Sequence, residues 1–374
     1  MVGDDVDAMT REIVEQREPV VDTLIAGFNG GAHYGYEHVL ADIFKSVYEV
    51  KQSELNKNPK LVNIFGIIPE KDPYWQGNLE EIKRILKGVG IETNVFFGAE
   101  GGLEDIDNAR NASLSITFGR WGELPARVLS EKFDIPVIQK AALPVNAAEE
   151  KELIEEIGNV ISLEQDLVDD FLNKEFSYES SYYGRIRDEV IELGFGKSVA
   201  IVGDEEQVIR LGRIAKDIFG ANVVAAVLTD SLKKDEEHEL NNSELLSTIT
   251  NNVYKTSDQK DIDDIIRQAK AEIIIGRSLE SNVAKKAGIP LVEASYPIYH
   301  KSILNQPAAG VRGAVSFVSD YLTTEKEAQK EKSQVLYGYL KLLKEHNSWQ
   351  EHSTKKGQVK QLNLISELAS RESI

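Results

Sequence analysis

Several side chains suited to ligand binding or proton transfer follow directly on predicted β-strands. The segment GFNGGAHYGYEH, residues 27–38, comes after a short predicted strand at Pro19–Ile25 and places Asn29, His33 and Tyr34 among glycines. A glycine-rich backbone can turn tightly or approach a ligand closely. We predict that these three side chains line a functional cleft, although an ordinary turn would use the same residues.

The histidines do not indicate a metal site. His33 and His38 are five residues apart, and on a helix that spacing directs the two rings about 140° away from each other. His300 stands alone in SYPIYHK after a predicted strand. A hydrogen-bonded loop residue is its simplest interpretation, and a cleft-lining residue is the alternative. We predict no metal ligands in this chain.

A second candidate loop follows the strand predicted at Leu61–Ile68. It covers residues 69–77 and carries Asp72 and Trp75. A parallel sheet binds ligands at the carboxyl ends of its strands, which is where this loop begins. Trp75 either faces the same crevice or covers the edge of the core.

Arginine and tryptophan follow two further predicted strands. Arg120 and Trp121 come after Phe118, and Arg277 follows Ile275. An arginine at a strand end can bind an anion, but pairing with one of the many carboxylates is the simpler interpretation. We expect the loops at residues 27–33, 72–77 and 118–121 to converge on one crevice.

The composition excludes several classes of function. The 374 residues contain no cysteine, which rules out disulfides, thiol catalysis and clusters held by cysteine. The net charge of −19 disfavours nucleic acid and anionic membranes as partners. No apolar run reaches the roughly 20 residues that cross a bilayer, and MVGDDVDAM does not resemble a signal peptide. We expect a cytoplasmic location.

Two segments resemble nucleotide-binding motifs but do not match them. Gly196-Lys197-Ser198 resembles the end of a P-loop, but it precedes a strand instead of following one. The turn GDEEQ after Val202 lacks the glycines of a dinucleotide fingerprint, and Asp204 and Glu205 would repel a pyrophosphate. Asp204 with Gln207 is instead typical of a capping box at the start of a helix.

The elements that position these residues alternate between strands and helices. Asn78 with Glu81 predicts a capped helix before the strand at Ile91–Phe97. Helical spacing over residues 163–193 is interrupted at SYESSYY, and Thr324 with Glu327 predicts a separate last helix. The other predicted strands are Ala112–Phe118, Ile135–Gln139, Lys197–Val202, Val223–Leu228, Val253–Lys255, Glu272–Ile275 and Pro290–Glu293.

This alternation predicts an α/β protein built on Rossmann-like parallel sheets. The expected domains are a remnant of a first α/β domain at residues 1–60, a Rossmann-like domain at 61–161, a helical connection at 162–196, a second Rossmann-like domain at 197–323 and a C-terminal helical extension at 324–374.

Several segments together resemble the nitrogenase component 1 family, which includes nitrogenase subunits and dark-operative protochlorophyllide reductases. They are VGDD at residues 2–5, the GFNGGAHYGY loop, the run from IIPEKDPYWQG to VFFG, EKFDIPVI, ALPVNA, KSVAIVGDEE and the ending EASYPIYH with AAGVRGAVSFVSDYL. The resemblance covers roughly residues 1–323 and implies three Rossmann-like domains, of which the first is incomplete here. The segment PIYHKSILNQPAAGVRGA resembles the β-type branch that does not hold the active-site cofactor.

The chain departs from that family at the positions that hold metal clusters. Ile25 stands where the resemblance implies a bridging-cluster cysteine, and Phe118 stands where cofactor-holding subunits have a cluster cysteine. Neither side chain can ligate iron. The family uses iron–sulfur clusters, and we expect this chain to hold none.

The resemblance leaves two functions open. One is a β-type subunit of a nitrogenase-like oxidoreductase that pairs with a homologous, redox-active subunit or with itself and docks an ATP-dependent iron–sulfur reductase. The other is a degenerate module that binds an anion or a tetrapyrrole-like molecule without redox chemistry. A periplasmic-type binding protein shares the layout but would need a secretion signal.

We also expect the chain to form oligomers. An incomplete first sheet would leave an open edge that favours pairing with another chain. The long helix predicted from residue 325 to 347 carries apolar side chains on one side, which either dock a partner or pack back on the chain itself.

Overall fold

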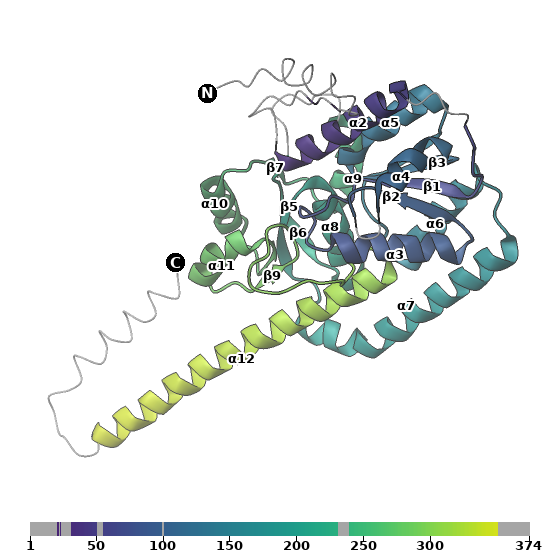
Figure 1. Ribbon diagram of the computed structural model, residues 1–374. Helices are drawn as coiled ribbons and strands as arrows, with labels where there is room; N and C mark the ends of the chain where they lie inside the picture. The colour runs from purple at the N-terminus through teal and green to yellow at the C-terminus, as the bar shows by residue number, and fades with distance from the viewer. Residues whose placement is uncertain are drawn as a thin grey trace, which may run out of the picture.

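Two parallel β-sheets form the framework of the molecule (Figure 1). The structure is a computed structural model that describes residues 21, 23, 31–50, 55–98, 101–230 and 239–350. The candidate Asn29 and all but residues 21 and 23 of the strand predicted at Pro19–Ile25 therefore lie outside the described residues. The strand pairs are parallel throughout both sheets, which confirms the predicted fold class.

The first sheet has four strands in the order β2-β1-β3-β4. They are β1 (Leu61–Phe65), β2 (Glu92–Val95), β3 (Leu114–Phe118) and β4 (Val137–Lys140). All five residues of β1 are buried, and so are all five of β3, as expected for strands covered on both faces. Because β1 has β2 on one side and β3 on the other, the carboxyl ends of β1 and β3 form a topological switch point.

The helices around this sheet cover both of its faces. On one face, α2 (Ala32–Val50) and α5 (Glu123–Phe133) contribute to a core that includes Phe44, Phe65 and Leu129. On the other face, α3 (Trp75–Gly88) and α6 (Ala147–Gly158) build a second core around Ile82 and Ile154. The short helix α4 (Leu103–Asn108) follows β2.

The second sheet has five strands in the order β7-β6-β5-β8-β9. They are β5 (Ser198–Gly203), β6 (Asn222–Leu228), β7 (Val253–Lys255), β8 (Ile273–Gly276) and β9 (Leu291–Glu293). Its helices are α8 (Glu205–Phe219), α9 (Glu239–Ile249), α10 (Gln259–Ala269) and α11 (Ser281–Ala287). Here β5 lies between β6 and β8, so its carboxyl end marks the switch point of the second sheet.

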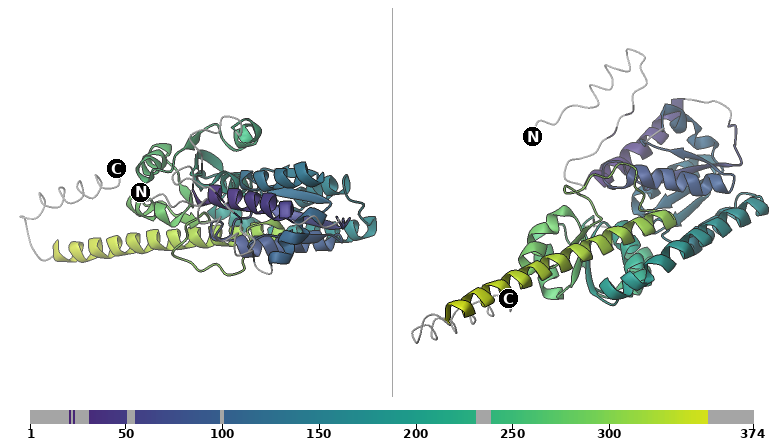
Figure 2. Two further views of the ribbon diagram at one scale, coloured as in Figure 1. Left: turned by 45° about the horizontal axis from the view of Figure 1, so that its top comes forward. Right: turned by 90° about the horizontal axis from the view of Figure 1, so that it is seen from below.

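Two long helices connect the sheets. The first, α7 (Gln165–Leu193), leads from one sheet to the other, and α12 (Gly310–Gln350) packs against α7, α3, α6 and β9. Figure 2 shows that the later part of α12 extends away from the body of the molecule. Among the described residues, no helix combines the length and the apolar character needed to cross a membrane.

The structure corrects four predictions about helices. The helix α2 begins at Ala32, so His33 and Tyr34 are helical and do not lie in a loop. The helix α3 begins at Trp75 with no side-chain cap, so the predicted Asn78 and Glu81 capping box is wrong. Both α7 and α12 are continuous, with no break at SYESSYY and no new start at Thr324. In α12 the Thr324 hydroxyl bonds back to the carbonyl of Asp320 inside the helix.

The domain boundaries at residues 61, 161, 197 and 323 remain a prediction. The two sheets fall within the ranges 61–161 and 197–323.

Candidate functional site

A narrow cleft lies where the strand ends of the two sheets face each other. It is lined by His33, Gly66, Ile67, Ile68, Asp72, Phe118, Gly119, Arg120, Trp121, Leu143, Asp204, Glu206, Gln207 and Asp230. Most of these residues follow β1, β3, β5 or β6 or begin α2, so both switch points contribute to one site. Four of the predicted site residues, His33, Asp72, Arg120 and Trp121, meet here.

The turn after β1 is shaped by Gly66. Its φ is +92°, and a Cβ there would lie 1.9 Å from the carbonyl oxygen of Phe118, so the two strand ends can approach only with glycine at this position. The chain then leads to Asp72, whose carboxylate accepts hydrogen bonds from the Tyr74 backbone N–H at 2.9 Å and from Asn78 Nδ2 at 2.6 Å. Burial raises the pKa of Asp72, and the charge of nearby Arg210 opposes that rise.

Asp72 belongs to a network that links the two sheets. The Asn78 side-chain oxygen accepts hydrogen bonds from the backbone N–H groups of Ala308 at 2.6 Å and Ala309 at 2.8 Å. The fully buried Arg210 of α8 pairs with Glu206 at 3.0 Å, and Glu206 also accepts from the Leu143 N–H at 3.1 Å. These contacts fix the relative position of the two walls of the cleft.

The loop after β3 is joined to the second sheet by a hydrogen bond from Trp121. Trp121 Nε1 donates to Asp230 Oδ2 at 2.9 Å, and the other oxygen of Asp230 accepts from the Glu205 N–H at 3.1 Å. Arg120 lies over the Trp121 ring, with its guanidinium carbon 4.4 Å from the ring centroid. Trp121 therefore serves as a contact between the two walls as well as a lining residue.

His33 faces Asp204 across the cleft. The distance from His33 Nε2 to Asp204 Oδ2 is 3.6 Å, and the imidazole lies beside the Trp121 ring with 5.5 Å between centroids. Asp204 also caps α8 by accepting from the Gln207 N–H at 2.9 Å, as predicted. Burial raises the pKa of Asp204 to about 6, an effect that Asp230 increases and His33 opposes.

Asp204 can gain or lose a proton near neutral pH, because burial raises its pKa to about 6. The imidazole of His33, whose Nε2 lies 3.6 Å from Asp204 Oδ2, is a group that can accept or donate that proton. Trp121, Phe118 and other apolar side chains of the cleft surround this pair. The arrangement suits proton transfer better than recognition of a charged ligand.

The charge and size of the cleft argue against an anionic or tetrapyrrole-like ligand bound inside it. Four carboxylates line it, from Asp72, Asp204, Glu206 and Asp230, and Glu206 is already paired with Arg210. Its free space is about 20 Å³, enough for about one water molecule.

The other predicted site residues lie elsewhere. Trp75 opens α3 and packs against the core of the first sheet, which matches the alternative of an aromatic that covers the core. Tyr34 stacks on His38, with 3.8 Å between ring centroids. Neither is among the residues that line the cleft, so the expectation for Tyr34 is wrong and, of the two alternatives for Trp75, the core position holds.

The two candidates beyond β8 and β9 make local contacts. Arg277 pairs with Glu280 at 2.6 Å and donates to Gln259 at 2.9 Å, which is the structural pairing considered from sequence. His300 is exposed and contacts Glu293 through Nδ1. Both belong to the second sheet and lie outside the cleft.

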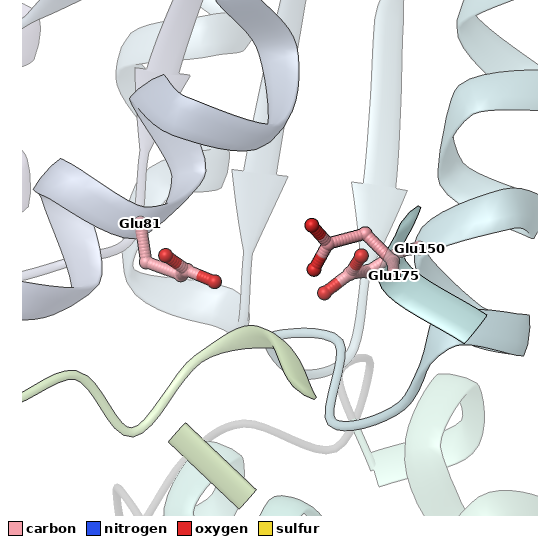
Figure 3. Close-up of side chains that lie close together, drawn as sticks. All are labelled: Glu81, Glu150 and Glu175. Atoms are coloured by element: carbon pink, nitrogen blue, oxygen red, sulfur yellow. The ribbon is translucent and has the colours of Figure 1, made fainter. Parts of the chain in front are cut away.

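Three buried glutamates form a cluster that no motif in the sequence predicts (Figure 3). Glu81 of α3, Glu150 of α6 and Glu175 of α7 are buried and bring one carboxylate oxygen each within 4.8 Å of the others. The N-terminus of α12 adjoins them, since the Val311 N–H donates to Glu150 at 2.9 Å. Helical periodicity could not reveal this cluster, because the three residues come from three different helices.

Arginine side chains pair with two of the three carboxylates in this cluster. Arg84 donates to Glu81 at 2.7 Å and to Glu175 at 2.8 Å, so its guanidinium lies between the two carboxylates. Arg312 Nη1 is 3.5 Å from Glu81. Burial raises the pKa of Glu150 to about 8, so Glu150 is largely protonated at neutral pH. A cation at the centre would have to displace Arg84.

Comparisons with known proteins agree on one family. A family model described as nitrogenase component 1 type oxidoreductase matches residues 1–325. The B-type subunit of the light-independent protochlorophyllide reductase of Prochlorococcus marinus (strain MIT 9215) is 26% identical over 285 residues, which are 74% of this chain and 51% of that protein. The corresponding protein of Halorhodospira halophila is 21% identical over 308 residues, which are 79% of this chain and 55% of that protein.

The fold is also found among solved structures. A structure of nitrogenase Cp1 at pH 6.5 superimposes with a TM-score of 0.68 at 19% identity, covering 87% of this chain and 73% of that chain. The chain spans about half the length of the curated relatives that it matches.

Proposed function

The chain belongs to the family of nitrogenase component 1 type oxidoreductases, and we propose that it acts there as a β-type subunit that holds no iron–sulfur cluster of its own. The similarity to the B-type subunits of protochlorophyllide reductases supports the β-type assignment. The whole sequence has no cysteine, so a cluster would lack its usual thiolate ligands.

The observation that carries the proposal is the position of Phe118. It is the last residue of β3, is 1% exposed and lines the cleft, at the place where the family resemblance implies a cysteine in cofactor-holding subunits. The strands β1 and β4 flank β3 on its two sides. An aromatic ring at this position fills the space with apolar surface and offers iron no ligand.

The proposed role of the chain is to complete an oxidoreductase complex. A homologous subunit, or a second chain of related fold, binds the redox cofactors. An ATP-dependent iron–sulfur reductase supplies the electrons. The reactions of such a complex consume protons with the electrons, and the pair formed by His33 and Asp204 is suited to pass protons within it. Because ATP drives electron delivery, the proposal places the complex in the cytoplasm.

The second candidate function, a redox-inactive module for an anion or a tetrapyrrole-like molecule, has less support. The cleft is acidic and holds about one water molecule. A ligand of that kind would need another site or an opened cleft.

Co-expression with the homologous subunit tests the proposal. We expect the two chains to copurify, with iron and acid-labile sulfide carried by the partner and none by this chain purified alone after anaerobic reconstitution. A Phe118→Leu variant serves as a control, because it keeps the site apolar and should leave the iron content of the complex unchanged. Stoichiometric iron on the isolated chain would contradict the proposal, and so would failure of the two chains to associate.

A further inference from the structure

A separate cavity of about 520 Å³ lies between α7 and α8, beside the start of α6. It is lined by Val145, Asn146, Ala148, Glu179, Tyr183, Ile186, Arg187, Val190, Ile191, Phe195, Ile214, Asp217 and Ile218. None of these residues lines the cleft between the sheets. Cavities of this size and composition are typical of sites for small organic ligands.

The walls of the cavity are apolar and partly open to solvent. Ile186 and Ile218 pack against the core of the second sheet from the cavity side. At the mouth, Ile191 is 62% exposed and Phe195 is 61% exposed. Large apolar side chains left exposed beside a cavity favour an apolar group as its occupant.

The polar side chains in this cavity include an unsatisfied hydroxyl. Tyr183 Oη is buried and has no hydrogen-bond partner within the part of the chain that the structure describes. A buried hydroxyl without a partner costs free energy that a ligand would recover. Burial, together with the charges of Glu179 and Asp217, raises the pKa of Tyr183, which indicates that both carboxylates lie near the hydroxyl.

The charge around Tyr183 is negative. In the described ranges, neither Glu179 nor Asp217 has an ion-pair partner. Burial raises the pKa of Glu179, and the nearby backbone N–H of Ala147 opposes that rise. Arg213 of α8 forms an ion pair with Glu149 at 3.0 Å, and it donates a hydrogen bond to the carbonyl of Leu143 at 2.9 Å. Arg187 lies at the rim, where it is exposed and contacts Asp188 at 3.5 Å.

We propose that the cavity between α7 and α8 binds an organic ammonium ion that carries an apolar chain or ring. The ammonium N–H groups donate to the carboxylates of Glu179 and Asp217 and to the hydroxyl oxygen of Tyr183. The apolar part lies along Ile186, Val190 and Ile214 and is shielded at the mouth by Ile191 and Phe195. This site is independent of the function proposed above, because it shares no residue with the cleft.

The test is calorimetric titration of the full chain with three probes that share one apolar chain, octylammonium, octan-1-ol and octanoate. We expect one octylammonium per chain, with octan-1-ol bound at least about tenfold more weakly, since its hydroxyl has a single O–H donor and no positive charge to pair with the two carboxylates. Octanoate should not bind measurably, because its carboxylate would face two others.

Variants locate the site. The double variant Glu179→Gln and Asp217→Asn keeps the shapes of both side chains and should weaken octylammonium binding about tenfold or more. Tyr183→Phe should weaken it about tenfold, the effect of losing one hydrogen bond from a charged donor. The matched control, Asp166→Asn with Glu192→Gln, removes two exposed charges elsewhere on α7 and should leave the affinity unchanged.

These variants are nearly isosteric, and circular dichroism checks that each is folded. The proposal is overturned if octylammonium does not bind, if octanoate binds as tightly, or if the double variant binds like the control. Equal binding of octan-1-ol would show an apolar pocket without selection for charge and would equally refute it.

Discussion

His33 Nε2 lies 3.6 Å from Asp204 Oδ2, so one pair of titratable side chains joins the first turn of α2 to the N-terminus of α8. The two residues belong to different parts of the sequence and meet only because both sheets present their strand ends to one cleft. The same contact brings an acid with a pKa of about 6 next to an imidazole.

Replacing Asp204 with Asn should stabilise the protein above pH 6. The folded-state pKa of about 6 is higher than the value of about 3.9 in an unfolded chain, so the native state loses stability as the pH rises through this window. Asn removes that loss and can still cap α8. The free energy of unfolding by urea should rise by about 1 to 2 kcal/mol at pH 7.5 and change little at pH 4.

Asp258→Asn is the matched control, because Asp258 caps α10 in the same way but is exposed. This variant should not gain stability between pH 4 and pH 7.5, because the exposed side chain lacks the burial that acts on Asp204. A variant at position 204 that is destabilised equally at both pH values would contradict the proposed effect of burial.

Removing Arg84 should destabilise the fold strongly. The change Arg84→Ala leaves Glu81 and Glu175 buried without their main partner, and breaking a buried ion pair costs about 3 kcal/mol or more. Arg267→Ala removes an exposed arginine that also contacts two carboxylates and should cost less than about 1 kcal/mol. Urea denaturation at pH 7 measures the free energy of unfolding of both variants. Equal losses of stability would show that burial of the glutamate cluster does not raise the cost of removing its arginine.

The variant Glu150→Gln should gain stability relative to the wild type as the pH rises from 4 to 8. The native pKa of about 8 exceeds the unfolded value of about 4.3, so the wild type loses stability across this window and the Gln variant does not. The relative gain should reach about 2 to 4 kcal/mol near pH 8. Gln can still accept the hydrogen bond from Val311.

Glu152→Gln, an exposed change on the same helix, supplies the comparison for this pH series. If the free energies of unfolding of the wild type and of Glu150→Gln changed in parallel with pH, the expected effect of burial on Glu150 would be refuted.

The exposed end of α12 should promote association. Val335, Leu336, Tyr337 and Leu340 are 74%, 58%, 73% and 48% exposed on a stretch that extends from the body (Figure 2). Deleting residues 333–374 keeps the buried contact of Glu325 with Lys197 and removes this surface. Light scattering over a range of concentrations should show oligomers for the full chain and a shift towards monomer for the shortened one. A full chain that stays monomeric at high micromolar concentration would refute the expectation.

The alternating pattern of the sequence was sufficient to predict the two parallel sheets. Runs such as LVNIF and SVAIV are apolar at every position or nearly so, and only a strand covered on both faces buries such a run completely. The rule that ligands meet parallel sheets at strand ends then placed His33, Asp72, Arg120 and Trp121 near one another.

The residues that neighbour a helix end in the sequence did not determine where the helix begins or which partner a side chain binds. Asn78 and Glu81 have the spacing of a capping box, but in the folded protein Asn78 binds the backbone at Ala308 and Ala309 and Glu81 binds Arg84. A cap contributes about 1 kcal/mol, so buried hydrogen bonds with distant segments can outweigh it. The predicted break before Thr324 failed for a related reason, since α12 continues through that residue while packing against other elements.

The sequence by itself therefore determined the order of the strands, the absence of thiolate ligands and the strand ends that carry polar side chains. Only the tertiary structure decided that Asp204 faces His33, that Glu81, Glu150 and Glu175 converge on one point, and that Trp75 turns into the core. Periodicity and spacing describe neighbours along one element, whereas a buried charge takes its partner and its pKa from residues that the packing of separate elements brings within a few ångströms.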